Sequence, residues 1–488
     1  MKKISKKYLI ILIFVISCLF YLLGVILINN NEYNKYFHFK SIIPNSIKHY
    51  LKNTIFIIPS LKNEIKILSE NNQELEQELG EKQKKIDQLR NKLLTKLEET
   101  ANFNIQKKNH KIKTKIFEYN YNQFETDFLS NGKADDAKAS GYIEEYEDKI
   151  VIASGDGKFL HFKKKDLNKD NFQATFIKSN IKDIINYPEF YQKSKFGIKD
   201  LYIEKEELYI SYSNQVSKDC FNTSILVAKI NFDFLNFKKF FSPKECVQKE
   251  NDYGSFNAHI TGGRITNFTK NKILFSTGSF QYSSHSQNEK NIFGKVLSIQ
   301  KDTGNWNLIS MGHRNVQGLG FDIEKNIIFS TEHGPMGGDE FNLNLLPINE
   351  IKNYGWPISS YGEHYGGRIK KNDWKYKKAP LEKSHSKFGF IEPVKYFVPS
   401  IGISEVIKVP KKFNSNFNND FFISSMGNNK EEGDLSIHHI KLNKNFTEVI
   451  SEDLILINQR IRDLKYINDI NKIILFVENS PGIGIISF

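Results

Sequence analysis

Cysteine is scarce in this chain, with only three residues, at positions 18, 220 and 246, among 488. Cys18 lies inside a long apolar run, so a framework of several disulfides is excluded. At most one bridge, between Cys220 and Cys246, is left for the rest of the chain. We expect that bridge because this part of the chain is predicted to lie outside the cytoplasm, where disulfides persist. Two unpaired thiols are the alternative.

Charge is absent from residues 8–28, whose sequence is YLIILIFVISCLFYLLGVILI. About 20 apolar residues are enough to cross a bilayer as a helix. A cleavable signal peptide has a shorter apolar core and a small-residue cleavage site, and neither is evident here. Lysines precede the run, so we predict an uncleaved single-pass anchor (residues 1–30) in the cytoplasmic (inner) membrane. Its N-terminus would lie in the cytoplasm and the bulk of the chain on the periplasmic, extracytoplasmic side.

Acidic residues are fewer than basic ones: 69 lysines and arginines against 56 aspartates and glutamates give a formal net charge of +13. The lysines are spread along the whole chain, which favours attraction to anionic lipid and not to nucleic acid. No nucleic acid is therefore expected as a partner. The densest basic stretch, RIKKNDWKYKK at residues 368–378, is interpreted as a solvated loop. A hydrophobic content of 39% and an aromatic content of 13% argue against a disordered chain.

Residues 60–99, which follow a tether at residues 31–59, have the pattern of a coiled coil. Apolar residues alternate at spacings of four and three over about five heptads, and Glu, Gln and Lys fill most other positions. The seam consists of Leu61, Ile65, Leu68, Asn72, Leu75, Leu79, Lys82, Ile86, Leu89 and Leu93. We predict a stalk that forms a homo-oligomer through residues 60–98, either a dimer or a trimer. The alternative is one amphipathic helix packed on its own globular domain.

Helical periodicity is missing from about residue 112 onward, where short apolar runs alternate with polar turns rich in Gly, Asn and Asp. Many short strands separated by turns are typical of a sandwich, a barrel or a propeller. One unit recurs: RITNFTKNKILFSTGS, GLGFDIEKNIIFSTEHG and DLKYINDINKIILFVENS each place two apolar strands around a turn and end in a small polar loop. Such repeats suggest blades of about four strands, and roughly 360 residues suit about six of them. We therefore predict an all-β, six-bladed β-propeller over residues 112–488.

Two loops between these strands combine residues suited to ligand binding. The sequence GHRNVQG contains His313, Arg314, Asn315 and Gln317, whose donors and acceptors suit a polar, anionic small molecule. A hydrogen-bonded network that pins neighbouring blades is the alternative. The sequence HGPMGGDE exposes the carbonyls of Gly334 and Pro335 beside the carboxylates of Asp339 and Glu340. Carbonyl and carboxylate oxygens are what Ca²⁺ prefers, and a capped turn is the alternative.

A third loop, NAHITGGR at residues 257–264, places His259 before a glycine pair and a strand. Together these loops resemble the glucose/sorbosone dehydrogenase family, the soluble-type pyrroloquinoline quinone (PQQ) sugar dehydrogenases. The likeness covers roughly the last three quarters of the chain and leaves out the predicted anchor and stalk. The specific motifs are GHRNVQGLGFD, EHGPMGGDEFNL, NYGWPISSYGEHY and FGKVLSI; weaker matches are AHITGGRI, FVPSIGIS and RIRD.

The resemblance implies a propeller with a cofactor site at one mouth of its central channel. His259 would be the general base for a sugar hydroxyl, and Arg314 and Asn315, with Gln317 beside them, would hold the quinone. Gly334 and Pro335 would offer carbonyls to a Ca²⁺ ion at the cofactor, and Asp339 and Glu340 would belong to a structural calcium loop. Arg460 and Arg462 would face the carboxylates of PQQ.

The chain departs from the family pattern at three places. Ser279 stands where an aspartate would orient the histidine. An expected glutamine has no counterpart in FGIKDLYI, and an expected lysine is replaced by the insertion MGNNKEEGD, in which Lys430 is the nearest substitute. Two functions therefore remain open: a membrane-anchored PQQ-dependent dehydrogenase of sugars or aldehydes, or a non-catalytic propeller that binds a glycan or protein partner and is displayed on the oligomeric stalk.

Overall fold

The computed structural model describes residues 14–19, 46, 57–96, 100–129, 140–251, 256–347, 350–365 and 372–488. The chain divides into two compact units, Met1–Glu98 and Glu99–Phe488. Of the predicted membrane span at residues 8–28, only residues 14–19 are described, and they are helical; the rest of the span lies outside the described residues, as does most of the tether. Among the residues that are described, no helix is long and apolar enough to span a bilayer.

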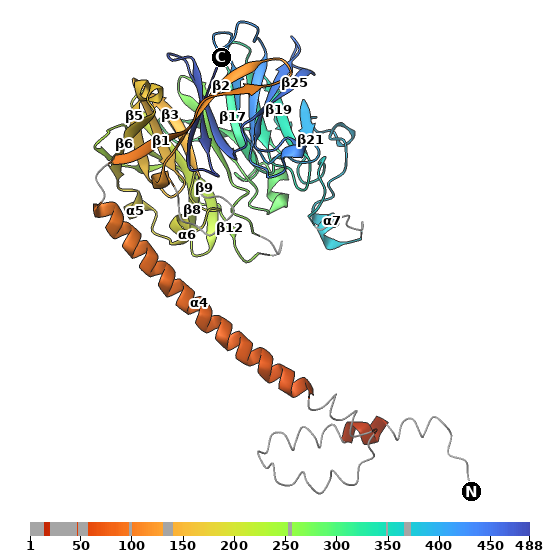
Figure 1. Ribbon diagram of the computed structural model, residues 1–488. Helices are drawn as coiled ribbons and strands as arrows, with labels where there is room; N and C mark the ends of the chain where they lie inside the picture. The colour runs from red at the N-terminus through yellow and green to blue at the C-terminus, as the bar shows by residue number, and fades with distance from the viewer. Residues whose placement is uncertain are drawn as a thin grey trace, which may run out of the picture. The chain divides into compact units, whose positions relative to one another are not determined.

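The first unit contains one long helix, α4 (Ile57–Lys96), of 40 residues (Figure 1). Its length and position match the predicted stalk. The seam residues whose side chains are described and apolar are each more than half exposed, and they are Ile65, Leu68, Leu75, Leu79, Ile86 and Leu89. Ion pairs such as Lys82–Glu78 join polar residues one turn apart. The apolar seam is therefore exposed in a single chain, and its pairing with a second copy stays a prediction.

We expect the chain from residue 57 onward to sediment as a dimer or trimer. Changing Leu75 and Leu79 together to glutamate should make it a monomer, because burying each leucine stabilises an assembly by about 1.5–3 kcal/mol per chain. Gln77→Glu adds charge outside the seam and should leave the assembly intact. A wild-type protein that sediments as a monomer at high concentration would contradict the prediction.

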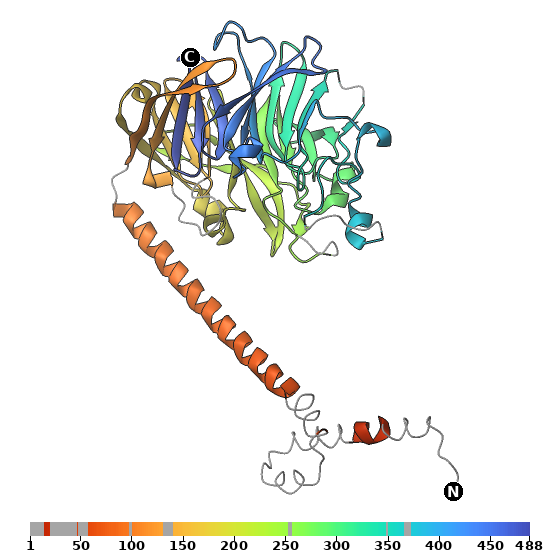
Figure 2. The same cartoon turned by 45° about the vertical axis from the view of Figure 1, so that its right-hand side comes forward.

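In the described part of the second unit, the strands form five sheets that divide into six four-stranded blades (Figure 2). Blade 1 consists of β3 (Gly141–Tyr146), β4 (Lys149–Ser154), β5 (Phe159–Lys163) and β6 (Asn171–Ser179). Blade 2 consists of β7 (Ile198–Glu204), β8 (Glu207–Ser217), β9 (Cys220–Lys229) and β11 (Lys238–Phe241). Blade 3 consists of β13 (Gly262–Thr269), β14 (Lys272–Thr277), β15 (Lys295–Gln300) and β16 (Trp306–Met311). Blade 4 consists of β17 (Val316–Asp322), β18 (Ile327–Glu332), β19 (Asp339–Leu345) and β21 (Lys395–Phe397). Blade 5 consists of β22 (Ile403–Val409), β23 (Asp420–Ser425), β24 (Ser436–Leu442) and β25 (Val449–Leu456). Blade 6 consists of β26 (Ile461–Ile467), β27 (Lys472–Val477), β28 (Gly482–Ser487) and β2 (Glu118–Glu125).

Short elements complete the unit. Three two-residue strands pair at blade edges, namely β10 (Phe234–Leu235) with β6, β12 (Val247–Gln248) with β9 and β20 (Lys352–Asn353) with β16. The loops carry the helices α5 (Ile181–Ile184), α6 (Glu189–Gln192) and α7 (Trp374–Lys378), and the 3-10 helices η3 (Asp127–Leu129), η4 (Lys164–Asn168), η5 (Ser283–Gln287), η6 (Ser386–Phe388) and η7 (Lys430–Glu432).

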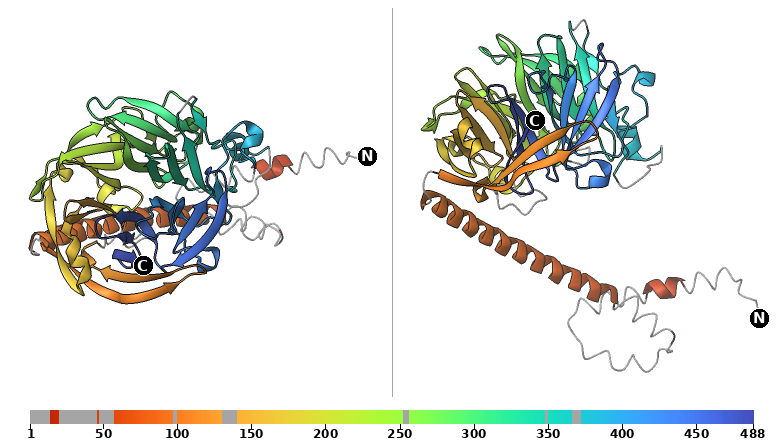
Figure 3. Two further views of the ribbon diagram at one scale, coloured as in Figure 1. Left: turned by 90° about the horizontal axis from the view of Figure 1, so that it is seen from above. Right: turned by 45° about the horizontal axis from the view of Figure 1, so that its top comes forward.

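The blades form a closed ring. The first strands of consecutive blades contact one another in the order β3, β7, β13, β17, β22 and β26, and β26 returns to β3. Seen from above, the sheets surround a central axis (Figure 3). Blade 6 joins both ends of the unit, because β2 pairs with β28, and β1 (Thr100–Lys113) links β2 to β6 of blade 1. The predicted all-β, propeller-like fold is confirmed, and its strands begin at Thr100, before the expected residue 112.

The middle strands of the blades are buried on both faces because each blade packs between two others. In β27 the residues Ile473, Ile474, Leu475, Phe476 and Val477 are all fully buried. A strand covered on both sides needs a continuous apolar run instead of an alternating one, and KIILFV is such a run. Burial of one such side chain contributes about 1.5–3 kcal/mol, so these runs hold the blades together.

β-bulges interrupt the first strands of the blades near the axis. Among the described strands the register shifts within residues 198–200, 262–265, 316–318, 403–406 and 461–463, in blades 2 to 6. A bulge puts two residues opposite one and redirects a side chain. It is at these places that charged side chains meet at the axis.

Arg264 lies at the axis and contacts residues of all five other blades. Its Nη1 lies 2.9 Å from Asp200, 2.8 Å from Glu405 and 2.7 Å from Asp463. Its Nε donates to the carbonyl of Gln317 (2.5 Å) and its Nη2 to that of Arg462 (2.8 Å). The guanidinium also lies 4.9 Å from the ring centroid of Tyr142 in blade 1. With Arg264 only 3% exposed, one buried cation is shared among three buried carboxylates.

This cluster predicts that stability falls as the pH rises from about 4 to about 8. Burial raises the pKa of Asp200 to about 7 and that of Glu405 to about 8, although Arg264 opposes both shifts. Carboxyls in the unfolded chain titrate near about pH 4, so between about pH 4 and 8 the folded state holds more protons. The stabilisation is complete below that interval and is lost as the pH rises through the folded pKa values.

We therefore expect the free energy of unfolding, measured in urea, to decrease from about pH 5 to about pH 8 and to level off above it, by up to about 1.4 kcal/mol per pH unit for each carboxyl that is protonated in the folded state and ionised in the unfolded chain. The double variant D200N/E405Q should flatten that slope. A wild-type stability that rises over the same interval would contradict the assignment.

Candidate functional site

Four of the predicted residues meet where blades 3 and 4 adjoin. Asn315 Nδ2 donates to the carbonyl of His259 (3.2 Å), and its Oδ1 accepts from the amide of Gly262 (3.0 Å). The neighbouring Arg314 Nη1 donates to the carbonyl of Gly334 (2.6 Å). The histidine loop, the GHRNVQG loop and the HGPMGGDE loop are thus joined by hydrogen bonds. We call the region defined by His259, Arg314, Asn315 and Gly334 the mouth.

Arg314 is a nearly buried cation at the mouth. It is 7% exposed, and its guanidinium lies 5.4 Å from the ring of Trp356. Burial lowers the pKa of Arg314, and contact with Tyr365 opposes that shift. Among the described residues, the indole Nε1 of Trp356 is buried and has no hydrogen-bond partner. A buried cation beside an unused donor is an arrangement that an anionic ligand completes.

His259 is exposed at the mouth and is held through its main chain. Its amide donates to Asn257 Oδ1 (2.9 Å), and its carbonyl accepts from Asn315. Ser279 is fully buried nearby: its amide donates to the carbonyl of Arg314 (3.0 Å), whereas its Oγ has no hydrogen-bond partner among the described residues. At the position where the resemblance implies an aspartate, the chain thus has a buried neutral hydroxyl.

Arg460 and Arg462 are held side by side by one carboxylate. Glu478 accepts from Arg460 Nε (3.1 Å) and from Arg462 Nε (2.6 Å). Arg462 Nη1 reaches Gln317 Oε1 at 3.5 Å, and Gln317 Nε2 donates to Asn315 Oδ1 at 3.0 Å. The predicted arginine pair is thereby connected to the mouth. Lys430, the suggested substitute for the missing lysine, is exposed in η7.

The acidic pair Asp339 and Glu340 does not converge on one point. The two are neighbours in β19, and neighbouring side chains of a strand point to opposite faces. Asp339 accepts from the amides of Gly334 (3.0 Å) and Ile403 (2.9 Å). Glu340 instead accepts from His385 Nε2 (3.0 Å). The expectation of one calcium loop built by both carboxylates therefore does not fit this arrangement.

A buried polar network lies beneath Arg314, and most of its residues were not predicted from the sequence. Glu332 accepts from the amide of Arg314 (2.8 Å) and bonds to His313 Nδ1 (3.0 Å). Asn342 Nδ2 donates to Glu332 (3.0 Å) and to Glu340 (3.2 Å), and Glu340 continues to His385. Burial raises the pKa of Glu340. The network fixes the main chain that carries Arg314.

A recurring position in the repeated unit would have found two of the missed residues. Aligning the segments NIIFSTE and KIILFVE places Glu332, the last residue of β18, at the same position as Glu478, the residue after β27. Each carboxylate bonds to the segment that opens the first strand of its own blade. In blade 3 the corresponding residue is Gly278, which carries no side chain.

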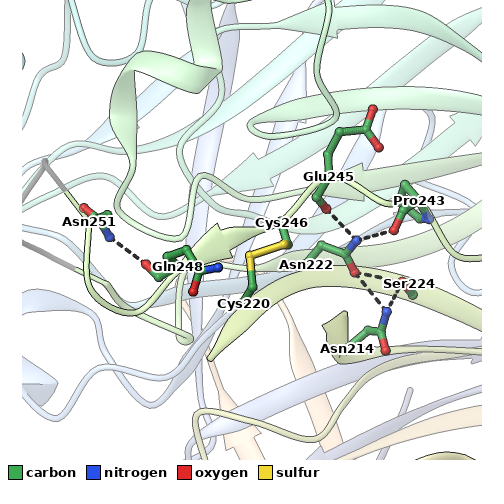
Figure 4. The surroundings of a disulfide bond; sticks show 9 residues. All are labelled: Asn214, Cys220, Asn222, Ser224, Pro243, Glu245, Cys246, Gln248 and Asn251. Atoms are coloured by element: carbon green, nitrogen blue, oxygen red, sulfur yellow. Dashed lines mark hydrogen bonds between the residues drawn. A yellow bond between two sulfur atoms is a disulfide. The ribbon is translucent and has the colours of Figure 1, made fainter. Parts of the chain in front are cut away.

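Cys220 and Cys246 form a disulfide with sulfur atoms 2.01 Å apart, as expected (Figure 4). The bridge ties the start of β9 to the segment before β12. Beside it, Asn222 Nδ2 donates to the carbonyls of Pro243 (2.9 Å) and Glu245 (2.8 Å). Disulfide and amide together hold the segment that leads towards the histidine loop.

Replacing both cysteines with serine should lower the free energy of unfolding by about 3–4 kcal/mol, the value expected for closing a loop of this length. The sequence separation is 26 residues. Urea unfolding with and without reductant measures the effect, and the double variant should no longer respond to reductant. Equal stability of wild type and variant would contradict the prediction.

Comparison with known proteins decides the family. Residues 155–485, more than half of the chain, match the family model for glucose/sorbosone dehydrogenase. The chain belongs to the glucose/sorbosone dehydrogenase family. This confirms the resemblance seen in the loop motifs.

Individual relatives of this glucose/sorbosone dehydrogenase family member are distant. An uncharacterised protein of Synechocystis is 31% identical over 156 residues, 32% of this chain and 33% of that protein. The aldose sugar dehydrogenase YliI of Escherichia coli is 24% identical over 235 residues, 44% of this chain and 58% of that protein. The crystal structure of the soluble aldose sugar dehydrogenase from Escherichia coli, in its apo-form, matches with a TM-score of 0.55 and 20% identity over 72% of this chain and 96% of that one. The matched region thus spans about one third and just over half of the two relatives' lengths, and the structural likeness supports the fold.

Proposed function

We propose that the protein is a PQQ-dependent dehydrogenase that oxidises an aldose or a related aldehyde at the mouth of its propeller. The observation that carries the proposal is the hydrogen-bonded junction of His259, Asn315, Arg314 and the Gly334 carbonyl. These residues come from three separate loops, and family membership supports reading them as a cofactor site.

The donors at the mouth fit PQQ, which carries three carboxylates beside its quinone. Arg314, Arg460 and Arg462 offer guanidinium groups, and Trp356 offers a buried N–H without a partner. Guanidinium groups bind carboxylates strongly because the hydrogen bonds are charge-assisted. These residues would hold the cofactor, with Asn315 and Gln317 adding amide groups between them.

When bound, PQQ supplies the two-electron acceptor for hydride. The task of the chain is to bind the sugar beside it and to remove the hydroxyl proton. His259 is the candidate base: its imidazole is exposed at the mouth, where it takes the proton onto a ring nitrogen. The main-chain bonds to Asn257 and Asn315 help to place His259.

No step is assigned to calcium. Of the residues proposed to bind it, the Gly334 carbonyl already accepts from the cation Arg314, and the Pro335 carbonyl accepts from Ser400 Oγ (3.3 Å). Among the described residues, no group of three or more His, Cys, Asp or Glu side chains is arranged to hold a metal ion. Titrating the protein with Ca²⁺, with and without PQQ, tests whether these carbonyls bind it.

Dye reduction by the purified chain, supplied with PQQ and an aldose, tests the proposal. Dye reduction that depends on both additions supports it. The second candidate function, a propeller that only binds a glycan or protein partner, is favoured by the uncharged Ser279. PQQ-independent binding of a glycan, without any dye reduction, would favour that alternative.

Membrane anchoring through residues 8–28, with the propeller on the periplasmic side, belongs to the same proposal. It is supported by the uncharged apolar run and by the lysines ahead of it. Electrons would then leave at the membrane that carries the respiratory chain. Fractionation of cells with protease added to the outer face of the membrane tests it: the propeller should be cleaved from the anchor, and protection would contradict this topology.

A further inference from the structure

One fully buried carboxylate binds both of the arginines that are proposed to bind the cofactor. Glu478 is 0% exposed, and its two oxygens accept from Arg462 Nε and Arg460 Nε, one each. Burial of a carboxylate is costly unless it is paired and hydrogen-bonded, and two cations supply that pairing here. The conformation of this triad is therefore strongly determined.

The register of blade 6 builds this triad. Ile461 of β26 pairs with Val477 of β27, so Arg460 and Glu478 stand next to that pair on adjoining segments. The amide of Glu478 donates to the carbonyl of Arg460 (2.9 Å), which extends the pairing by one residue. The bulge between Ile461 and Asp463 then redirects Arg462, so that both arginines reach the same carboxylate.

The Nη ends of the two arginines meet different partners. With each Nε bound to Glu478, the Nη groups are the ends that meet other partners: Arg460 Nη1 donates to the carbonyl of Met426, and Arg462 Nη1 reaches Gln317. Gln317 continues to Asn315, and Asn315 to the carbonyl of His259. An unbroken series of contacts thus runs from Glu478 to the candidate base.

We propose that Glu478 is a positioning residue for the anionic cofactor: by holding both Nε groups it presents the Nη ends of Arg460 and Arg462 to carboxylates at the mouth. The inference rests on the proposed function, since PQQ is the anion considered. In blade 4, Glu332 stands at the equivalent position of the repeated unit, but it accepts from the main-chain amide of Arg314 and not from its guanidinium. A carboxylate at this position therefore contacts an arginine of the site in two blades, and only Glu478 holds guanidinium groups.

The direction in which Kd for PQQ changes when Glu478 is neutralised distinguishes a positioning role from a purely electrostatic one. The triad carries two positive charges and one negative charge, so electrostatics alone predicts that neutralising Glu478 strengthens the binding of an anion. Positioning predicts the reverse, because freed guanidinium groups lose the fixed geometry that bidentate binding of carboxylates needs.

The experiment is a calorimetric titration of PQQ into the chain from residue 57 onward, as wild type, Glu478→Gln and Glu478→Asp. We expect Glu478→Gln to raise Kd at least about tenfold. Glu478→Asp keeps the charge but is too short to reach both arginines, and it should weaken binding as well. The control is Asp420→Asn. It removes a buried carboxylate from its pair with His439 at the start of β23, whereas Met426, which contacts Arg460, follows the end of that strand. This variant should leave Kd unchanged.

Each outcome has one meaning. Weaker binding by both Glu478 variants, with thermal unfolding still cooperative, supports positioning. Tighter or unchanged binding by Glu478→Gln overturns it while leaving the proposed function intact. If Glu478→Gln does not fold, the result with Glu478→Asp decides. A wild-type protein that binds no PQQ overturns the proposed function, and this inference falls with it.

Discussion

Arg264→Met is expected to destabilise the propeller by about 3–5 kcal/mol, the cost of removing one partner from a buried charge pair. Three carboxylates, from Asp200, Glu405 and Asp463, would remain at the axis without their cation. Since domains are typically stable by only about 5–15 kcal/mol, a large part of the total would be lost. Urea unfolding at about pH 7 measures the difference.

Two further variants show whether the loss of stability comes from the Arg264 cluster at the axis. Arg264→Lys keeps the charge but lacks the fork of donors that serves carboxylates and the carbonyls of Gln317 and Arg462 at once, so an intermediate loss is expected. Lys395→Met removes a partly exposed cation from Glu452 and should cost about 1 kcal/mol or less. Equal stabilities of Arg264→Met and Lys395→Met would contradict the view that Arg264 locks the ring.

His259→Ala is expected to lower kcat for aldose oxidation by about 10²–10⁴-fold, the usual contribution of a general base. Binding of PQQ should change little, because the contact between His259 and the arginine-bearing loop is made by its main-chain carbonyl, which alanine retains. Dye-linked assays at saturating PQQ, combined with a PQQ titration, separate the two effects.

The matched control is His110→Ala, which removes an exposed histidine from β1. It should leave both kcat and PQQ affinity unchanged. A His259→Ala protein that keeps more than about one tenth of the wild-type kcat would remove His259 from the role of base. Loss of PQQ binding in that variant would instead indicate a structural role for the loop.

The fold could be predicted because its signal is local and repeated. Apolar strands such as KIILFV are long enough to be recognised one at a time, and their recurrence with the same turn indicated blades. The loops at the mouth were predicted for a similar reason, since Arg314 and Asn315 stand together in one short motif. What the sequence could not supply was register, which depends on partners far away in the chain.

Register explains both the divergence of the predicted acidic pair and the residues that were not predicted at the site. Asp339 and Glu340 are adjacent in a glycine-rich stretch that predicted a loop, yet Asp339 pairs with Phe397 and begins β19, so the two carboxylates diverge. Glu478 follows an apolar strand in the unremarkable sequence VEN, and only the pairing of β26 with β27 brings it to Arg460 and Arg462. Arg264 likewise gains its five partners only when the ring closes.

The most direct test of a PQQ site at the mouth is the fluorescence of Trp356. The chain has three tryptophans, so W306F/W374F leaves Trp356, 5.4 Å from the Arg314 guanidinium, as the single reporter. PQQ is predicted to quench this emission saturably with one-to-one stoichiometry, and Arg314→Ala should abolish that response. Emission that does not change with PQQ at micromolar concentration, in a protein that is folded, would contradict the account.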